Sequence, residues 1–131
     1  MPLSDYKILV VDDEDDILEI VSFNLRKAGY RVYIANSPEI AFNIAMEQIP
    51  HLILLDIMMP GKDGIQLCNE IRSIRYLQDC IIAFFSACSE DQMMATAFAC
   101  GAQGYITKPI RPKDLLVKIN HLLKLNVPVG R

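Results

Sequence analysis

The chain has 131 residues, of which 52% are hydrophobic, and carries 13 Lys and Arg against 16 Asp and Glu, a formal net charge of −3. This length is typical of a single domain, and the apolar content is sufficient for a buried core and argues against disorder. Without a basic excess, direct nucleic-acid binding is not expected. No apolar run approaches the ~20 residues of a membrane span, so membrane insertion is not expected either.

Five short apolar runs alternate with five amphipathic segments along the chain. The runs predict strands over residues 7–11, 31–35, 52–56, 81–86 and 105–107. Because apolar and polar residues hardly alternate within them, the runs are typical of parallel strands that are buried on both faces of a sheet.

The segments between the strands have apolar residues at helical spacing. The first helix is predicted to stop at Gly29, the second to begin at Ser37-Pro38, and the last to begin at Pro112. The residues expected to face inward are, in chain order, Ile17, Ile20, Val21, Leu25, Ala28, Ile40, Ala41, Ile44, Ala45, Ile65, Cys68, Ile71, Met94, Ala97, Phe98, Leu115, Ile119, Leu122 and Leu123.

Strict alternation of strand and helix predicts an α/β fold with right-handed crossovers. We expect a doubly wound, five-stranded parallel sheet of the flavodoxin-like kind, with strand order 2-1-3-4-5. Functional residues of such sheets lie just beyond the carboxyl ends of the strands, so the polar residues at those ends are the candidates for a site.

Acidic residues stand at two of these strand ends. Asp12 and Asp13 follow the first strand, and Asp56 ends the third. Since these two strands are neighbours in the predicted order, the three carboxylates should converge. Two carboxylates ~4 Å apart repel by about 4 kcal/mol at an effective dielectric near 20, so raised pKa values, a divalent cation or a nearby lysine must offset the repulsion. An all-oxygen site of this kind favours Mg²⁺, with Mn²⁺ as the alternative.

The fourth and fifth strands contribute a hydroxyl and an ammonium group to the same edge. Ser86 ends the fourth strand, and Lys108 follows the fifth. A carboxylate beside Mg²⁺, a lysine and a hydroxyl is similar to the apparatus that stabilises a transferring phosphoryl group. Asp56 stands alone at a central strand end, so we expect it to be the nucleophile that forms an acyl phosphate.

Four segments carry a family resemblance. They are Val10-Val11-Asp12-Asp13-Glu14, Leu55 to Gly64, Phe85-Ser86-Ala87 and Gly104-Tyr105-Ile106-Thr107-Lys108-Pro109. In this order and at these strand ends, the chain resembles a response-regulator receiver domain of two-component signalling. The match extends from about Lys7 to Leu125, which implies a receiver domain over residues 1–125 and a tail or linker start over residues 126–131.

The resemblance implies roles for the acidic residues. Asp56 resembles the phosphoacceptor, which takes its phosphoryl group from a histidine kinase, a phosphotransfer protein or a small phosphodonor. Asp13 resembles the direct Mg²⁺ ligand, with Asp12 acting mostly through water. Asp56 and the backbone carbonyl of Met58 complete the implied protein ligands.

The resemblance also implies roles for the residues of the last two strands. Ser86 and Lys108 resemble the groups that bind the phosphoryl oxygens, and the Lys108–Pro109 peptide is expected to be cis. Tyr105 resembles the switch aromatic, which rotates inward when Ser86 moves toward the phosphoryl group. The rotation would remodel the surface of helix four, strand five and helix five, where a downstream protein or output domain would bind.

Four residues at three places depart from the family's common patterns. Met58 and Cys88 resemble the positions that flank the path of the hydrolytic water, and neither can act as a strong base there, which predicts a long-lived acyl phosphate. Gln103-Gly104 stands where many DNA-binding members carry an acidic pair, so the charge-bridged dimer of those members is not implied.

The cysteines and the N-terminal segment favour a cytoplasmic protein. The cysteines at positions 68, 80, 88 and 100 include no Cys-x-x-Cys pair. This spacing argues against a zinc site and a disulfide scaffold and predicts reduced thiols. The first apolar run ends at Asp12 and Asp13, so a signal peptide is not expected.

Two alternatives to a phosphorylated signalling domain are open. A Mg²⁺-dependent phosphatase or phosphotransferase could form an aspartyl phosphate, but such enzymes usually need a second acid two residues after the nucleophile, where this chain has Met58. A pseudo-receiver would act through protein contacts alone, and the presence of all five polar site residues argues against it.

Overall fold

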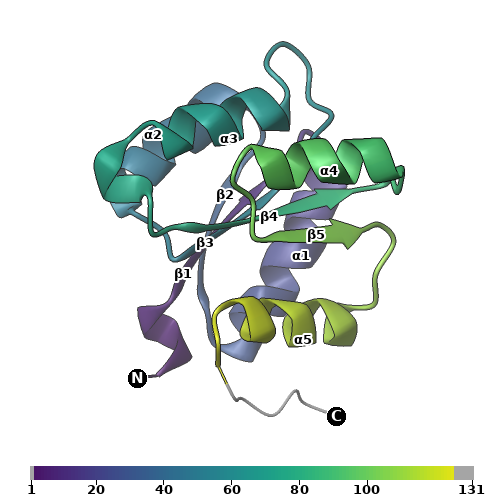
Figure 1. Cartoon of the computed structure of the whole chain (residues 1–131). Helices are drawn as coiled ribbons and strands as arrows, with labels where there is room; N and C mark the ends of the chain where they lie inside the picture. The colour runs from purple at the N-terminus through teal and green to yellow at the C-terminus, as the bar shows by residue number, and fades with distance from the viewer. Residues whose placement is uncertain (1, 126–131) are drawn as a thin grey trace.

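A five-stranded parallel sheet forms the centre of the computed structural model, which describes residues 2–125 (Figure 1). The strands are β1 (Lys7–Val11), β2 (Arg31–Ala35), β3 (Leu52–Leu55), β4 (Ile81–Ser86) and β5 (Gly104–Thr107). Their order across the sheet is β2-β1-β3-β4-β5, which confirms the predicted fold class and strand order. The predicted tail over residues 126–131 lies outside the described residues.

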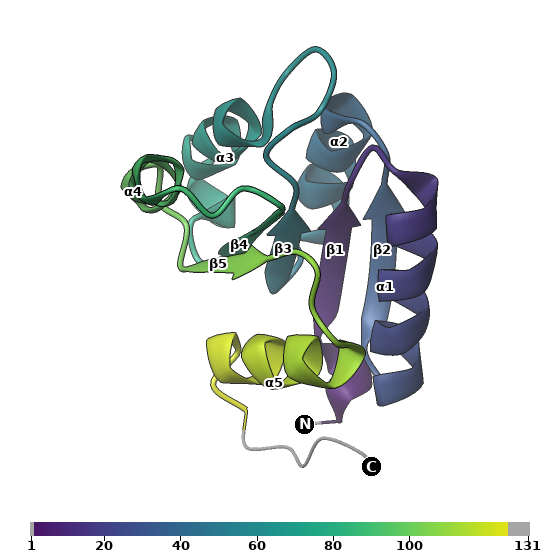
Figure 2. The same cartoon turned by 90° about the vertical axis from the view of Figure 1, so that its right-hand side faces the viewer.

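Within residues 2–125, five α-helices cover the two faces of the sheet (Figure 2). They are α1 (Asp15–Ala28), α2 (Pro38–Gln48), α3 (Gly64–Arg72), α4 (Asp91–Ala99) and α5 (Pro112–Leu122), with short 3₁₀ turns over Leu3–Asp5 and Arg75–Leu77. Buried residues of α1 and α5 form one core cluster with the sheet, and those of α2, α3 and α4 form the other. None of the helices over residues 2–125 has the length and apolar character needed to cross a membrane.

Local sequence signals set several helix ends. Gly29 ends α1 with a φ of 114°, a left-handed conformation that glycine adopts without a Cβ penalty. The Ser37 side chain caps α2 by accepting from the backbone N–H of Ile40. Asp63 and Gln66 form a reciprocal capping box at the start of α3, which fixes where the loop after β3 ends.

The central strands are buried on both faces, as their apolar runs predict. Leu9 and Ile53 are fully buried in the core on the α2 side, and Ile8 and Leu52 are fully buried in the core on the α1 side. Successive residues of one strand therefore point to opposite faces of the sheet and pack into different cores. This packing makes the sheet a rigid support for the residues that follow its strand ends.

Three residues expected to face inward are exposed instead. The exposed fraction is 58% for Ile20, 46% for Ile40 and 46% for Phe98. Successive helical residues are about 100° apart, so only a narrow stripe contacts the sheet. In α1 that stripe passes through Leu18, Val21, Ser22 and Leu25, while Ala41 and Ala45 of α2 and Ala97 of α4 occupy it in the other two helices.

Candidate functional site

An acidic cluster lies at the carboxyl ends of β1 and β3. Val11 pairs with Leu55 at the ends of the two strands, so the next residues, Asp12 and Asp56, stand side by side. One oxygen from each of Asp12, Asp13 and Asp56 lies within 4.8 Å of the other two. The predicted convergence of the three carboxylates is therefore confirmed.

The three carboxylates differ in their contact with solvent. Asp12 is 1% exposed and Asp56 is 5% exposed, whereas Asp13 is exposed. One Asp12 oxygen accepts from the backbone N–H of Glu14 at 3.0 Å, which holds the side chain in place. The cluster therefore consists of two buried acids and one exposed acid.

Lys108 brings the positive charge to this cluster from the end of β5. Its Nζ atom is 2.7 Å from an Asp12 oxygen and 3.8 Å from an Asp56 oxygen. The lysine is positioned by its own backbone N–H, which donates to the Ser86 carbonyl at 2.8 Å. The peptide between Lys108 and Pro109 is cis, as the resemblance implies.

Asp56 remains a destabilised carboxylate despite this lysine. Burial, followed by the negative charge of Asp12, raises the pKa of Asp56 from 3.8 to about 6. The Lys108 charge and a hydrogen bond from the Met58 backbone N–H act in the opposite direction without cancelling the effect. Three carboxylates thus face one ammonium group, and the charge imbalance with an all-oxygen donor set fits a hard divalent cation.

Ser86 and Tyr105 are linked through one residue of the loop after β4. The buried Ser86 hydroxyl oxygen accepts from the Cys88 backbone N–H at 3.1 Å. The Tyr105 hydroxyl donates to the Cys88 carbonyl at 2.5 Å, and burial raises the Tyr105 pKa. Both side chains are therefore hydrogen-bonded to the backbone of Cys88, Ser86 to its N–H group and Tyr105 to its carbonyl.

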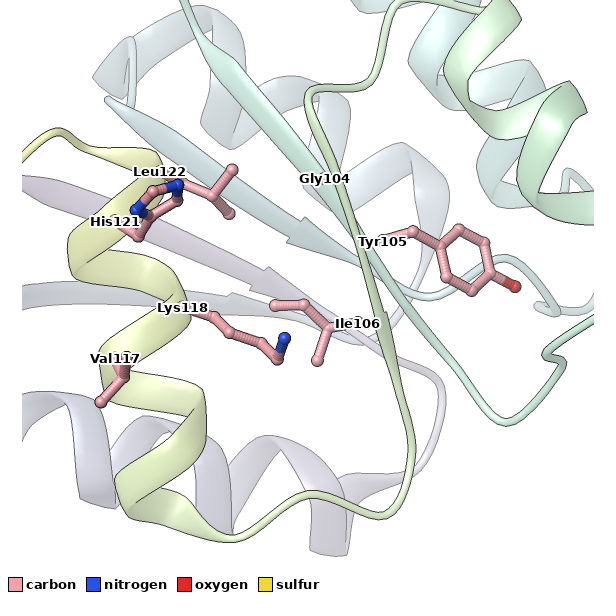
Figure 3. Close-up of a pocket in the computed structure, with 7 residues that line it drawn as sticks. All are labelled: Gly104, Tyr105, Ile106, Val117, Lys118, His121 and Leu122. Atoms are coloured by element: carbon pink, nitrogen blue, oxygen red, sulfur yellow. The ribbon is translucent and has the colours of Figure 1, made fainter.

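Tyr105 also stands beside a pocket at the edge of the sheet. This pocket, between β5 and α5, has a volume of about 340 Å³ and is lined by Gly104, Tyr105, Ile106, Val117, Lys118, His121 and Leu122. The Tyr105 ring extends from β5 to the side away from α5 (Figure 3). The residue thus contacts the α4 side with its ring while its backbone borders the pocket on the α5 side.

The predicted site residues on the loop after β3 have different surroundings. Met58 is 67% exposed, whereas Met59 is 8% exposed and packs into the core. The backbone N–H of Met58 contacts Asp56, and its carbonyl is the atom that the resemblance implies as a metal ligand.

Sequence reasoning missed Gly64, which positions the site, and a link between Gln103 and Arg72 near the start of β4. A Cβ atom on Gly64 would lie 2.2 Å from the Asp56 carbonyl oxygen, so this glycine lets α3 begin directly against the site. Gln103 Oε1 accepts from both the Ile82 N–H and Arg72 Nη2 at 2.8 Å. The Asp63-Gly64 pair in the sequence could have signalled the close approach, but no local pattern links Gln103 with Arg72.

Comparisons with known proteins agree with this geometry. The family model of the response regulator receiver domain matches residues 8–120. Chemotaxis protein CheY4 of Vibrio cholerae is 27% identical with a TM-score of 0.86, covering 89% of this chain and 98% of that chain. A CheY-like receiver domain protein of Methanospirillum hungatei is 28% identical with a TM-score of 0.85, covering 91% and 94%. The receiver domain of DrrB, an OmpR/PhoB homologue of Thermotoga maritima, is 32% identical with a TM-score of 0.82, covering 91% and 97%. The chain therefore belongs to the response regulator receiver domains of two-component signalling.

Proposed function

We propose that the chain is a phosphoacceptor module in which Asp56 takes a phosphoryl group from a histidine kinase, a phosphotransfer protein or a small phosphodonor. The observation that carries this proposal is the convergence of three carboxylates within 4.8 Å, with Lys108 in contact with two of them. A purely structural role would not require so many buried charges at one strand edge.

The chain's own residues would hold a Mg²⁺ ion in this cluster. Asp13, which is exposed, is suited to bind it directly, Asp56 and the Met58 carbonyl are suited to complete the protein ligands, and Asp12 is suited to act through water. When bound, the ion supplies positive charge that offsets the charge on the carboxylates and on the phosphoryl oxygens. Mn²⁺ has the same preference for oxygen and is the alternative.

The transfer step requires an ionised Asp56 oxygen. With a pKa of about 6, the Asp56 carboxylate is mostly ionised at neutral pH even before metal binds. Its oxygen forms a bond to phosphorus, while the bond from phosphorus to the donor's nitrogen or oxygen breaks and the donor keeps the electron pair. Lys108 and the Ser86 hydroxyl are the groups available to bind the transferred phosphoryl oxygens.

Phosphorylation would reach the surface through Cys88. If the Ser86 hydroxyl turns toward the phosphoryl group, the Cys88 N–H loses its present acceptor. The carbonyl of the same residue accepts the Tyr105 hydrogen bond, so a shift of Cys88 releases Tyr105 to rotate inward. The change alters the surface formed by α4, β5 and α5, where we place the downstream protein or output domain.

The signalling role sets the expected lifetime and location. Neither the exposed Met58 side chain nor the partly buried Cys88 thiol is a strong base, so the chain assists loss of its own phosphoryl group only weakly. An aspartyl-phosphate phosphatase usually needs an acid two residues after its nucleophile to protonate the leaving group. Met58 stands at that position here and is not an acid, so the phosphatase alternative is disfavoured. We place the module over residues 1–125 and in the cytoplasm, where the ATP that a histidine kinase uses as its phosphoryl source is available.

Intact-mass spectrometry after incubation with a small phosphodonor tests the proposal. We expect one phosphoryl group per wild-type chain with Mg²⁺ and little with EDTA. Asp56→Asn should stay unlabelled, while Asp63→Asn, which keeps a capping side chain on the same loop, should label normally. Equal labelling of Asp56→Asn and wild type would falsify the assignment.

A further inference from the structure

Two cysteines from different elements lie in contact outside the acidic site. Cys68 is on α3, and Cys100 is the residue that ends α4. The Cys68 thiol donates to the Cys100 carbonyl at 3.4 Å. Cys68 is fully buried, whereas Cys100 is partly exposed, and both thiols are free. Cys100 is thus the member of the pair that reaches the surface of the protein, whereas Cys68 does not.

Arg72 holds these two segments together. Arg72 lies one helical turn after Cys68 on α3, and Gly101 directly follows Cys100. The Arg72 Nε and Nη2 atoms donate to the Gly101 carbonyl at 3.0 and 2.8 Å. Gly101 has a φ of +101°, which turns the chain from α4 into β5. The contact between the cysteines is therefore fixed by a second set of bonds and does not depend on the thiols alone.

Each thiol donates to a backbone carbonyl: Cys68 to Cys100, and Cys100 to Ala97 at 3.0 Å. Burial, and then the neighbouring Cys100 side chain, raise the pKa of Cys68 to about 12, and Cys80 and Arg72 are also close enough to affect it. Within residues 2–125, however, only Asp12, Asp13 and Asp56 bring three ligand atoms close enough for one metal ion. Pairwise thiol chemistry is therefore favoured over a metal–thiolate site.

We propose that Cys68 and Cys100 form a redox pair, which a peroxide converts to an intramolecular disulfide between α3 and the end of α4. In the first step, the Cys100 thiolate attacks one peroxide oxygen, the O–O bond breaks, and a sulfenic acid and water form after protonation. In the second step, Cys68 sulfur attacks the sulfenic sulfur and expels its hydroxyl group as water. The sum is two thiols and one H₂O₂ giving one disulfide and two waters, and an external thiol reverses it.

The surroundings of Cys68 set the rate of this reaction. Since the thiolate is the reactive form and the Cys68 thiol is mostly protonated at neutral pH, the second step is slow and accelerates as pH rises. The expected product is an intramolecular bridge because Cys100 is already in contact with the buried thiol, which no second chain can reach.

The disulfide would also regulate the signalling surface, and this part rests on the proposed function. The bridge ties the C-terminal end of α4 to α3 through residues that the phosphorylation switch does not use. It would restrict movement of α4 when Tyr105 rotates. The oxidised protein is therefore expected to accept a phosphoryl group on Asp56 but to show smaller changes on α4.

Peptide mapping of the folded protein after H₂O₂ treatment tests the pair directly. We expect intact wild-type chain to lose two hydrogens and to yield a cross-linked peptide containing Cys68 and Cys100, and dithiothreitol should reverse both changes. The double variant Cys80→Ala/Cys88→Ser should behave in the same way. Cys100→Ser should form no intramolecular bridge, with unchanged far-UV circular dichroism as the control for folding.

The outcomes separate this proposal from the proposed function. A cross-linked peptide in a chain that is not labelled by phosphodonor supports the redox pair alone. Labelling of a chain that shows no Cys68–Cys100 peptide, only intermolecular disulfides or a sulfinic acid on Cys100, overturns the redox pair and leaves the phosphoacceptor role intact.

Discussion

Asp56 is a carboxylate whose charged form is disfavoured by its surroundings. Its pKa is about 6 in the folded chain and 3.8 ordinarily, so the folded state binds this proton more tightly than the unfolded state does. The group's contribution to stability is fully present below about pH 4 and is lost as pH rises through 6. The shift corresponds to roughly 3 kcal/mol at pH 7 in metal-free protein.

Replacement of this carboxylate should therefore stabilise the metal-free chain. In EDTA at pH 7.5 we expect Asp56→Asn to raise the free energy of unfolding by about 1 to 3 kcal/mol, and the gain should shrink toward pH 4. Urea denaturation across this range measures it. Asp16→Asn, which removes an exposed acid in the first turn of α1, is the control. A gain for Asp56→Asn that does not change with pH contradicts the account.

Lys108 compensates buried charge, which an exposed lysine does not. Lys108→Ala leaves Asp12, whose side chain is 1% exposed, without its partner at 2.7 Å. We expect a loss of about 2 to 4 kcal/mol in EDTA at pH 7, part of which Mg²⁺ should restore. Lys62→Ala is the matched control, because Lys62 and Glu70 form an ion pair whose side chains are 34% and 42% exposed; it should cost under about 1 kcal/mol. Equal costs for the two variants argue against a buried charge cluster.

At the scale of elements, the loop between β3 and α3 determines where the Asp56 backbone lies. The Gly64 N–H donates to the Ile57 carbonyl at 2.7 Å, and an added Cβ would lie 2.9 Å from the Ile57 Cα atom. We expect Gly64→Ala to cost about 2 kcal/mol or more, as overpacking against backbone does, and to slow labelling of Asp56.

The same loop provides a control for this prediction. Gly61 has a φ of +85°, but nothing lies within 4 Å of its Cβ position. Gly61→Ala should therefore cost only the backbone strain, about 1 kcal/mol, and leave labelling unchanged. Thermal unfolding and labelling rates compare the two variants. A Gly64→Ala chain that is as stable and as readily labelled as Gly61→Ala shows that the close approach is unimportant.

Arg72 joins α3 to the segments on either side of β4. Its guanidinium donates to the carbonyls of Cys80 and Gly101 and to the Gln103 side chain, each at 3.0 Å or less. Loss of these bonds in Arg72→Met should lower stability by about 2 to 3 kcal/mol. Arg75→Met, on the exposed turn that follows α3, should stay within about 0.5 kcal/mol of wild type. Urea denaturation midpoints of the two variants test this role. Equal midpoints for Arg72→Met and Arg75→Met would show that Arg72 is a dispensable surface arginine.

At the scale of the whole molecule, the features that follow from short sequence patterns were predictable. The apolar runs predicted the strands because buried parallel strands need apolar side chains on both faces. The convergence of Asp12 and Asp56 then follows from the pairing of β1 with β3.

Features that depend on the orientation of side chains in three dimensions were not predictable. Ile20 and Phe98 are exposed because the helices turn other residues toward the sheet. The bonds from Arg72 to Gly101 and Gln103 join residues about 30 positions apart, so no local pattern reports them. Contact between Cys68 and Cys100 is hidden in the sequence for the same reason.

Localisation of the acyl phosphate in the wild-type chain tests the central claim most directly. After treatment with a small phosphodonor, the acyl phosphate is reduced with borohydride and the modified residue is identified by tandem mass spectrometry. We predict modification of Asp56 alone, in Mg²⁺ and only weakly in EDTA. Modification of Asp12 or Asp13, or equal modification of Asp56 without a divalent cation, would contradict a crowded acidic cluster that prepares one aspartate for phosphorylation.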